Sequence, residues 1–423
     1  MSSKYPVSVR TCLPLCALVV ETAFILIFFF FTTYDVVSEK QQLMDKYQVF
    51  QDVTVMAALG LGFLASSFPK HSWSSIAFDL FILAVGVQWA VLLNGFLKDD
   101  YNGEIVIELS SIQVATMSAM SVLISASAVL GKTNLVQLMM MALVEVTAFS
   151  VVYMTSKKVF SLEECTSMMY IHVFAAYFGL AVTWCLSMST PSKEQMEERL
   201  AKSSSLFAML GTLFLWIFWP RFNSTLLYSP DERKNAVFNT YYALAVSTVT
   251  AISVSASAHP QGKINMAHIH NAVLAGGVAM GASCHLISSP WPAMVLGLLA
   301  GLISIGGAKC LPLICRPTYD AVCPQMRFHR MLMVHYTFGL PGLLGEFAYI
   351  IVKVYQLSST TNSLMCYKIL FDIGVLSFVM VMSLATGFLT GSLLRLKIWK
   401  APDRNKYYHD QTFWKFPHLA AGF

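Results

Sequence analysis

The chain has 423 residues, of which 56% are hydrophobic and 12% are charged, with a mean hydropathy of +0.61 and a formal net charge of +5. This composition excludes an ordinary water-soluble protein, because a surface that faces lipid must be apolar on all sides. The sequence has no basic tract of the kind that binds nucleic acid, so no nucleic-acid partner is expected. The class that remains is a polytopic protein whose partner is the lipid bilayer.

Twelve apolar segments follow one another along the chain, each close to the roughly 20 residues that a bilayer span requires. No small-residue cleavage site follows the first segment, which is therefore interpreted as an uncleaved helix and not as a signal peptide. An all-α membrane protein is predicted. The twelve segments are residues 13–33, 53–68, 76–97, 107–131, 133–154, 166–188, 204–220, 237–258, 266–287, 291–309, 331–354 and 367–394.

The distribution of basic residues predicts the orientation. An even number of spans puts both termini on one side, and that side carries 18 of the 28 lysine and arginine residues. The positive-inside rule therefore places both termini in the cytoplasm. The longest polar interruption, within residues 189–205, looks like a linker between two halves. We expect a transmembrane domain over residues 1–395, with its linker at 189–203, and a cytoplasmic tail over residues 396–423.

Glycine spacing indicates how the spans pack. Three pairs have the GxxxG spacing that lets helices approach closely in lipid. Together they favour a compact bundle over a loose set of membrane anchors. The pairs are Gly277 with Gly281, Gly297 with Gly301, and Gly387 with Gly391.

The nine cysteines contain no CxxC spacing, so neither a metal site nor a cofactor is predicted. Cys12, Cys185 and Cys310 lie near the expected cytoplasmic face and are candidates for S-palmitoylation. An equally good interpretation makes each of them a small hydrophobic residue at a helix end. Three further histidines are interpreted as interfacial or packing residues, because the first two cannot share a helix face; they are His268, His270 and His285.

Two stretches stand out among the spans. His172 in "MMYIHVFAAYFGL" is an ionisable side chain in the middle of a span, which indicates a functional site by default. The stretch "MVHYTFGLPGLLG" places His335, three glycines and a proline around Phe338. A glycine follows seven residues after both His172 and Phe338, at Gly179 and Gly345. This match suggests two inverted halves with a site between them.

These stretches resemble a known family. "IHVFAAYFGL" (171–180), "LFLWIFWPRFNS" (213–224) and "NAVLAGGVAMGASC" (271–284) are similar to the Amt/Mep/Rh ammonium channel superfamily, and the likeness to its Rh branch covers nearly the whole chain. The resemblance implies twelve transmembrane helices, with two inverted five-helix halves and an extra N-terminal helix. It also implies trimers with one pore in each subunit, and no enzymatic activity.

The resemblance assigns roles along that pore. Members of the family recruit ammonium, pass it between stacked phenylalanines and conduct neutral ammonia past two hydrogen-bonded histidines. His172 takes the place of the first pore histidine, and Phe222, followed by Asn223, that of the second gate phenylalanine. Glu164 stands where the family usually has aspartate, so its helix-capping contacts are expected to be displaced.

Two departures from the family pattern fall on the conduction path. Met117 in "VATMSAMSV" replaces the first gate phenylalanine, and Phe338 replaces the second pore histidine of the pattern VHxLHGxPG. The resemblance therefore implies channel architecture with an impaired ammonia pore. His335 lies one helical turn before Phe338 and is a less favoured candidate for a substitute imidazole.

Two functions remain open at this point. The first is a non-glycosylated, poorly conducting Rh-type subunit of a complex in the erythroid plasma membrane. Its partners would be further copies or Rh-associated glycoprotein-like relatives, in homo- or heterotrimers. Its cytoplasmic tail would contact proteins of the membrane skeleton. The second is an active channel for ammonium, ammonia or CO2 that uses His172 alone. The sequon "NST" at 223–225 overlaps the gate, so we expect it to carry no glycan.

Overall fold

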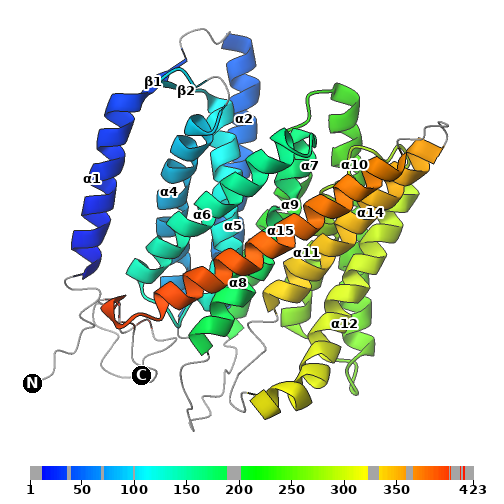
Figure 1. The fold of residues 1–423 in the computed structure, drawn as a ribbon. Helices are drawn as coiled ribbons and strands as arrows, with labels where there is room; N and C mark the ends of the chain where they lie inside the picture. The colour runs from blue at the N-terminus through cyan, green and yellow to red at the C-terminus, as the bar shows by residue number, and fades with distance from the viewer. Residues whose placement is uncertain are drawn as a thin grey trace, which may run out of the picture.

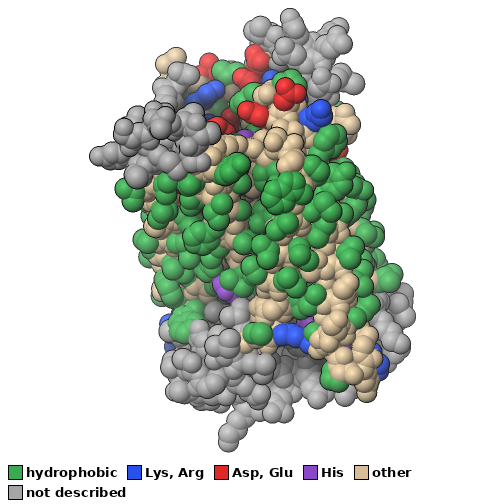
Figure 2. All heavy atoms as spheres, turned by 90° about the vertical axis from the view of Figure 1, so that its right-hand side faces the viewer, with side chains coloured by type: hydrophobic (Ala, Val, Ile, Leu, Met, Phe, Trp, Pro, Cys, Tyr) green, Lys and Arg blue, Asp and Glu red, His purple; other side chains and the backbone are tan. Residues whose placement is uncertain are grey.

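The computed structural model describes residues 12–35, 40–67, 71–98, 101–187, 202–322, 333–358, 365–399, 401, 410 and 413–414. The described residues form a bundle of long helices that run between two ends of the molecule (Figure 1). Apolar side chains cover its middle, while acidic side chains gather toward one end and basic ones lie toward both ends (Figure 2). This is the surface that a protein spanning a bilayer requires.

Each of the twelve predicted spans contains a helix among the described residues. Eleven helical segments among the described residues are long and apolar enough to cross a membrane, and the shorter α11 occupies the remaining predicted span. The first six spans are α1 (Leu13–Phe31), α2 (Lys40–Val55) with η2 (Met56–Leu61), α3 (Gly62–Leu64) and η3 (Ala65–Ser67), α4 (Ser72–Phe96), α5 (Leu109–Val129), α6 (Leu135–Lys158), and α7 (Glu164–Met169) with α8 (Ile171–Ser187). The others are α9 (Lys202–Ser224), α10 (Pro230–Ser257), α11 (Met266–Met280), α12 (Pro290–Val322), η4 (His335–Gly339) with α14 (Leu340–Ser358), and α15 (Met365–Leu394), before η5 (Lys397–Trp399).

Two five-helix halves account for the helices from α2 to α8 and from α9 to α14, which leaves α1 and α15 outside them. α1 stands at the edge of the bundle with little of its surface buried, whereas α15 crosses it diagonally, packed on α8 (Figure 1). α1 begins and α15 ends at the same end of the molecule, which we call the basal end; the other is the distal end (Figure 1). α9 begins at Lys202, inside the expected linker, and the rest of that linker lies outside the described residues.

The expected span at 266–287 is wrong in its second part, because α11 ends at Met280 and turns follow. A side chain of α10 holds these turns. Asn239 Nδ2 donates hydrogen bonds to the carbonyls of Cys284 (2.9 Å) and Ile287 (2.7 Å). Irregular backbone is tolerated at this depth because the protein supplies the missing partners.

The sequence patterns also missed a short sheet at the distal end. β1 (Thr32–Tyr34) pairs in parallel with β2 (Ile105–Ile107), with Thr32 opposite Ile105. The pairing fastens the end of α1 to the segment between α4 and α5. Strands of three residues lie below the length at which alternation of apolar residues is recognisable.

Small residues let the helices of the second half touch. A Cβ at Gly297 of α12 would collide with the backbone carbonyl of Ala243 on α10, and a Cβ at Gly276 of α11 would meet the same carbonyl from the other side. Similarly, a Cβ at Gly387 of α15 would lie 2.7 Å from the carbonyl of Phe178 on α8. Glycine therefore sets the distance between these helices, as the GxxxG spacing predicts.

We expect Gly297→Ala to destabilise the folded protein by about 1–3 kcal/mol, because the backbone of Ala243 has to shift to admit one methyl group. Thermal unfolding of the purified protein in detergent measures the effect. Gly306→Ala on the same helix is the matched control, since a Cβ there meets nothing within 4 Å. Equal melting temperatures for the two variants would contradict this account of the packing.

The C-terminal tail contacts the N-terminus of α4. Asp410 Oδ2 accepts a hydrogen bond from the amide of Trp73 and Oδ1 one from that of Ser74, both at 3.0 Å. The carboxylate thereby satisfies two donors that the first turn of a helix leaves open. Trp414 adds a hydrogen bond from its indole nitrogen to Ser74 Oγ at 2.9 Å.

Asp410→Ala is expected to free these two amides and to cost about 1 kcal/mol, the usual loss when a helix cap is removed. Hydrogen exchange at Trp73 and Ser74 should then be faster. Asp410→Asn keeps an acceptor oxygen and serves as the control, with slower exchange than the alanine variant. Exchange that does not change in the alanine variant would show that the tail is held elsewhere.

Candidate functional site

His172 lies at a break in the sixth span. α7 ends at Met169 and α8 begins at Ile171, so His172 is the second residue of α8. Its side chain is buried, and Nδ1 lies 3.3 Å from the carbonyl oxygen of Met169. A hydrogen bond at Nδ1 leaves Nε2 to face the surroundings, which are aromatic.

Three aromatic rings surround this imidazole. The ring of Phe338 stacks on it with a centroid distance of 6.2 Å and an interplanar angle of 4°. Trp219 stacks at 5.9 Å and 18°, and Phe222 approaches edge-on at 5.9 Å and 70°. Sequence reasoning missed Trp219, although it precedes Phe222 by three residues and therefore lies near it on the helix surface. Apolar surroundings of this kind favour the neutral imidazole over the charged imidazolium.

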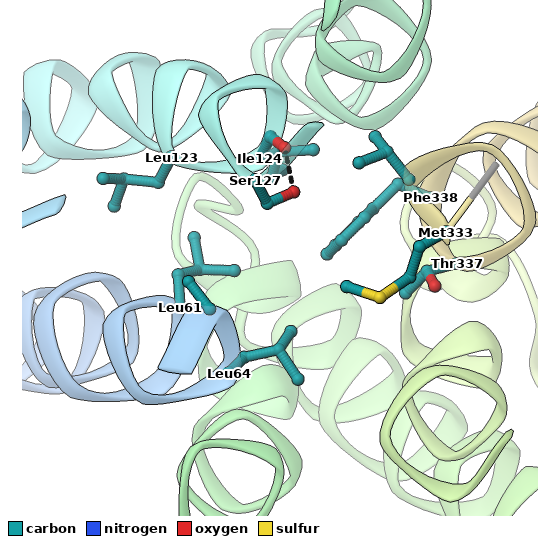
Figure 3. Close-up of a pocket in the computed structure, with 10 residues that line it drawn as sticks. Leu61, Leu64, Leu123, Ile124, Ser127, Met333, Thr337 and Phe338 are labelled. Carbon is teal, nitrogen blue, oxygen red and sulfur yellow. Dashed lines mark hydrogen bonds between the residues drawn. The ribbon is translucent and has the colours of Figure 1, made fainter. Parts of the chain in front are cut away.

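Phe338 belongs to η4, a π-helical segment at the start of the eleventh span. π-helical turns are rare and occur frequently at functional sites. The phenyl ring is 4% exposed and also lines an apolar pocket on the basal side, where it faces Leu61 and Leu64 across the hollow (Figure 3). Phe338 thus stands between His172 and that pocket.

The pocket offers few polar groups to a solute. It is lined by side chains of η2, α3, α5 and η4 and their neighbours: Leu61, Leu64, Ala65, Leu123, Ile124, Ser127, Met333, Val334, Thr337 and Phe338. The hydroxyl of Ser127 donates to the carbonyl of Ile124 at 2.6 Å, within its own helix (Figure 3). Thr337 Oγ1 is buried and has no hydrogen-bond partner among the described residues. An ion would find little here to replace its hydration.

The two predicted gate positions lie in the core. Met117 on α5 is fully buried, and so are Phe222 and the adjoining Asn223 near the end of α9. Asn223 Nδ2 donates hydrogen bonds to Thr240 Oγ1 at 3.0 Å and to the carbonyl of Gly277 at 3.1 Å. Because this amide is buried and hydrogen-bonded, a glycan does not fit on Asn223 in the folded protein.

Glu164 is the first residue of α7, at the distal end, and its carboxylate binds side chains instead of capping that helix. Oε1 accepts hydrogen bonds from Tyr153 (2.6 Å) and Lys157 (2.8 Å), and Oε2 accepts one from Tyr228 (2.7 Å). The cap residue, Glu163, makes no side-chain capping bond either. The hydrogen bond to Glu164, together with partial burial, raises the pKa of the Tyr228 phenol to about 12.

Glu163 extends from the same segment toward solvent. Its carboxylate approaches the His285 ring, with 3.2 Å between Oε2 and Nε2. The hydrogen bond from His285 lowers the pKa of the Glu163 carboxyl despite partial burial. The distal end therefore presents two adjacent carboxylates, of which Glu163 is largely exposed and Glu164 is bound by three side-chain donors.

His335 points elsewhere. Its ring packs edge-on against Tyr177, with centroids 5.5 Å apart, at a position five residues beyond His172 on α8. The side chain that stacks on His172 is Phe338. The structure therefore gives no support to His335 as a substitute partner for His172.

The three cysteines proposed as lipidation sites differ in exposure. Cys310 on α12 is exposed and Cys12 is half-buried. Cys185 on α8 is buried, with Sγ 3.6 Å from the carbonyl of Phe388 on α15. Acylation of Cys310 needs no rearrangement, whereas acylation of Cys185 requires α8 and α15 to separate.

Comparison with known proteins decides the family. The profile of the Ammonium Transporter Family matches residues 15–412. The chain belongs to the ammonium transporter family. Two relatives place it in the Rh branch, since the chain is 60% identical to RH-like protein IC of Gorilla gorilla gorilla and 59% identical to the human Blood group Rh(CE) polypeptide, each over the full length of both proteins.

Solved structures of this family share the fold. The Rh50 channel of Nitrosomonas europaea superposes with a TM-score of 0.75 and 26% identity, over 91% of this chain and 95% of that one. Mep2 of Saccharomyces cerevisiae gives a TM-score of 0.67 at 14% identity, over 88% of this chain and 92% of the other, which shows the fold alone. The resemblance seen in the sequence motifs is thus confirmed, and the expected channel fold with it.

Proposed function

We propose that this Rh-type protein is a subunit of an oligomeric membrane complex whose own ammonia pore conducts poorly or not at all. The observation that carries the proposal is the parallel stack of Phe338 on His172. A ring without any hydrogen-bonding group occupies the place of the second pore histidine. The relay of two imidazoles is therefore reduced to one.

The energetics support this reading of the pore. Ammonium cannot enter the apolar segment cheaply, so conduction requires deprotonation and intermittent hydrogen-bond partners for neutral ammonia. His172 provides one such partner, between Trp219 and Phe338. On the basal side the next groups belong to the apolar pocket, where Ser127 is already bonded to its own helix. Ammonia thus meets only the Thr337 hydroxyl as an unengaged group among the described residues that line the pocket, and no second imidazole.

The test is ammonia and methylammonium flux into liposomes that contain the purified protein. We expect rates close to those of protein-free liposomes, while an Rh family member with two pore histidines, reconstituted at the same density, serves as the positive control. Flux comparable to that control would favour the alternative, an active channel for ammonium, ammonia or CO2 that relies on His172 alone.

The complex that we propose consists of trimers, formed with further copies or with Rh-associated glycoprotein-like relatives, in the erythroid plasma membrane. Both termini would lie in the cytoplasm, in agreement with the distribution of lysine and arginine. The tail over residues 396–423 would contact the membrane skeleton, and palmitate on Cys12, Cys185 or Cys310 would strengthen attachment to the inner leaflet. The buried state of Asn223 supports a subunit without a glycan at its sequon.

A further inference from the structure

A group of three possible metal ligands lies at the distal end, apart from His172 and the three aromatic rings that surround it. It consists of Cys165 in the first turn of α7 and of Cys284 and His285 in the turns after α11. All three side chains are buried, and their ligand atoms lie within 4.8 Å of one another. The conduction path described above uses none of them. Sequence spacing could not reveal the group, because the first cysteine is far from the other two residues along the chain.

We propose that Cys165, Cys284 and His285 form a binding site for a thiolate-preferring divalent cation, with Zn²⁺ as the occupant that fits best. Two cysteine sulfurs and an imidazole nitrogen are ligands that Zn²⁺ prefers. A tetrahedral Zn²⁺, with bonds of about 2.3 Å to sulfur and about 2.1 Å to nitrogen, holds its ligand atoms roughly 3.5–3.8 Å apart. The group therefore has to contract by about 1 Å at most.

The surroundings of His285 match those of a metal ligand. Nε2 lies 3.2 Å from the carboxylate of Glu163, and Nδ1 is buried without a hydrogen-bond partner among the described residues, so Nδ1 is the nitrogen that we assign to the metal. Histidines that bind metals usually donate their other nitrogen to a carboxylate, which fixes the ring and increases its basicity. The Glu163 side chain is 66% exposed, so the site is buried directly beneath the distal surface. A cation in solution has a short way to reach it.

The site also contacts Asn223, next to Phe222 at the predicted second gate position. The carbonyl oxygen of Asn223 lies 3.5 Å from Cys165 Sγ and 3.7 Å from Cys284 Sγ. Asn223 follows Phe222, whose ring packs against His172. A metal on the two sulfurs would tie α7 to the turns after α11 around this carbonyl. Without metal both thiols donate hydrogen bonds to this carbonyl, and metal binding would replace them by metal–sulfur bonds next to the backbone that positions Phe222.

Titration of the reduced, metal-free full-length protein in detergent with Co²⁺ tests the site, because thiolate coordination gives a charge-transfer absorption band. We expect one Co²⁺ per chain, displaced by Zn²⁺, and loss of the band in both Cys165→Ser and Cys284→Ser. Cys185→Ser is the control, since this cysteine is equally buried but lies on the interface of α8 and α15. A band that is absent from the unchanged protein, or that persists in both serine variants, would overturn the proposal.

Glu163→Gln keeps the test decisive if the serine variants fail to fold, because this side chain is largely exposed. Loss of a carboxylate partner of a ligating histidine typically weakens metal binding about 10–100-fold. We expect a Co²⁺ dissociation constant raised by that factor, with Glu104→Gln, an exposed carboxylate elsewhere, as the control. Equal affinities for the two glutamine variants would mean that His285 does not coordinate the metal.

Discussion

Phe338→His is expected to open the pore to ammonia, with a flux at least about tenfold above that of the unchanged protein, which corresponds to a barrier lowered by about 1.4 kcal/mol. The ring at 338 already lies parallel to His172 at a centroid distance of 6.2 Å. An imidazole there needs only side-chain rotation to bring two nitrogens to a hydrogen-bond distance of about 3 Å. The measurement is methylammonium and ammonia uptake by liposomes at matched protein density.

Three further variants separate chemistry from steric hindrance. Phe338→Leu keeps an apolar side chain of similar bulk and should stay silent, whereas the double variant Phe338→His, His172→Ala should lose whatever the single variant gains. Phe338→Ala removes the bulk without adding an imidazole. If this alanine variant conducts as well as the histidine variant, the ring merely obstructs the path and the relay argument is wrong.

The number and order of the spans could be predicted from sequence because each span is a long apolar run in a chain that lipid forces to be helical. α11 is the instructive exception. Its apolar pattern continues to residue 287, yet the helix ends at Met280, since Asn239 of another helix bonds the carbonyls of Cys284 and Ile287. A tertiary contact of this kind leaves no trace in local hydropathy.

The candidate site shows the same difference between what local sequence patterns predict and what tertiary packing decides. His172 and Phe338 were identifiable because an ionisable residue in a span and a departure from a family motif are both visible in one stretch of sequence. The parallel stacking of these two rings is not visible there, and neither is the stacking of Trp219 on His172, because both depend on how α8, α9 and η4 pack. The metal-ligand group joins two cysteines that only the fold brings together. Motifs thus identify residues, while packing decides which of them meet.

Asp372→Asn is expected to lower the stability of the folded protein markedly. Asp372 on α15 is buried, and its two carboxylate oxygens both lie 3.0 Å from Lys353 Nζ on α14. Tyr349 accepts a further hydrogen bond from the same ammonium group at 2.9 Å. Removal of one member of a fully buried pair typically costs about 3–5 kcal/mol, because the other charge remains without its partner. The Lys353 side chain is 28% exposed and keeps part of its hydration, so we expect a cost toward the lower end of this range. Thermal unfolding in detergent should show a correspondingly lower melting temperature.

The double variant Asp372→Asn, Lys353→Met shows whether the cost comes from the stranded charge. Replacement of both members by uncharged groups is often neutral or even stabilising, so we expect the double variant to recover most of the lost stability. Lys353→Met alone should be destabilising, since the carboxylate of Asp372 is only 3% exposed and loses an ammonium group that lies 3.0 Å from both of its oxygens. If the effects of the two single substitutions simply add in the double variant, the pair is not coupled. α15 would then be held on α14 by apolar packing, and the ion pair would contribute little to the bundle.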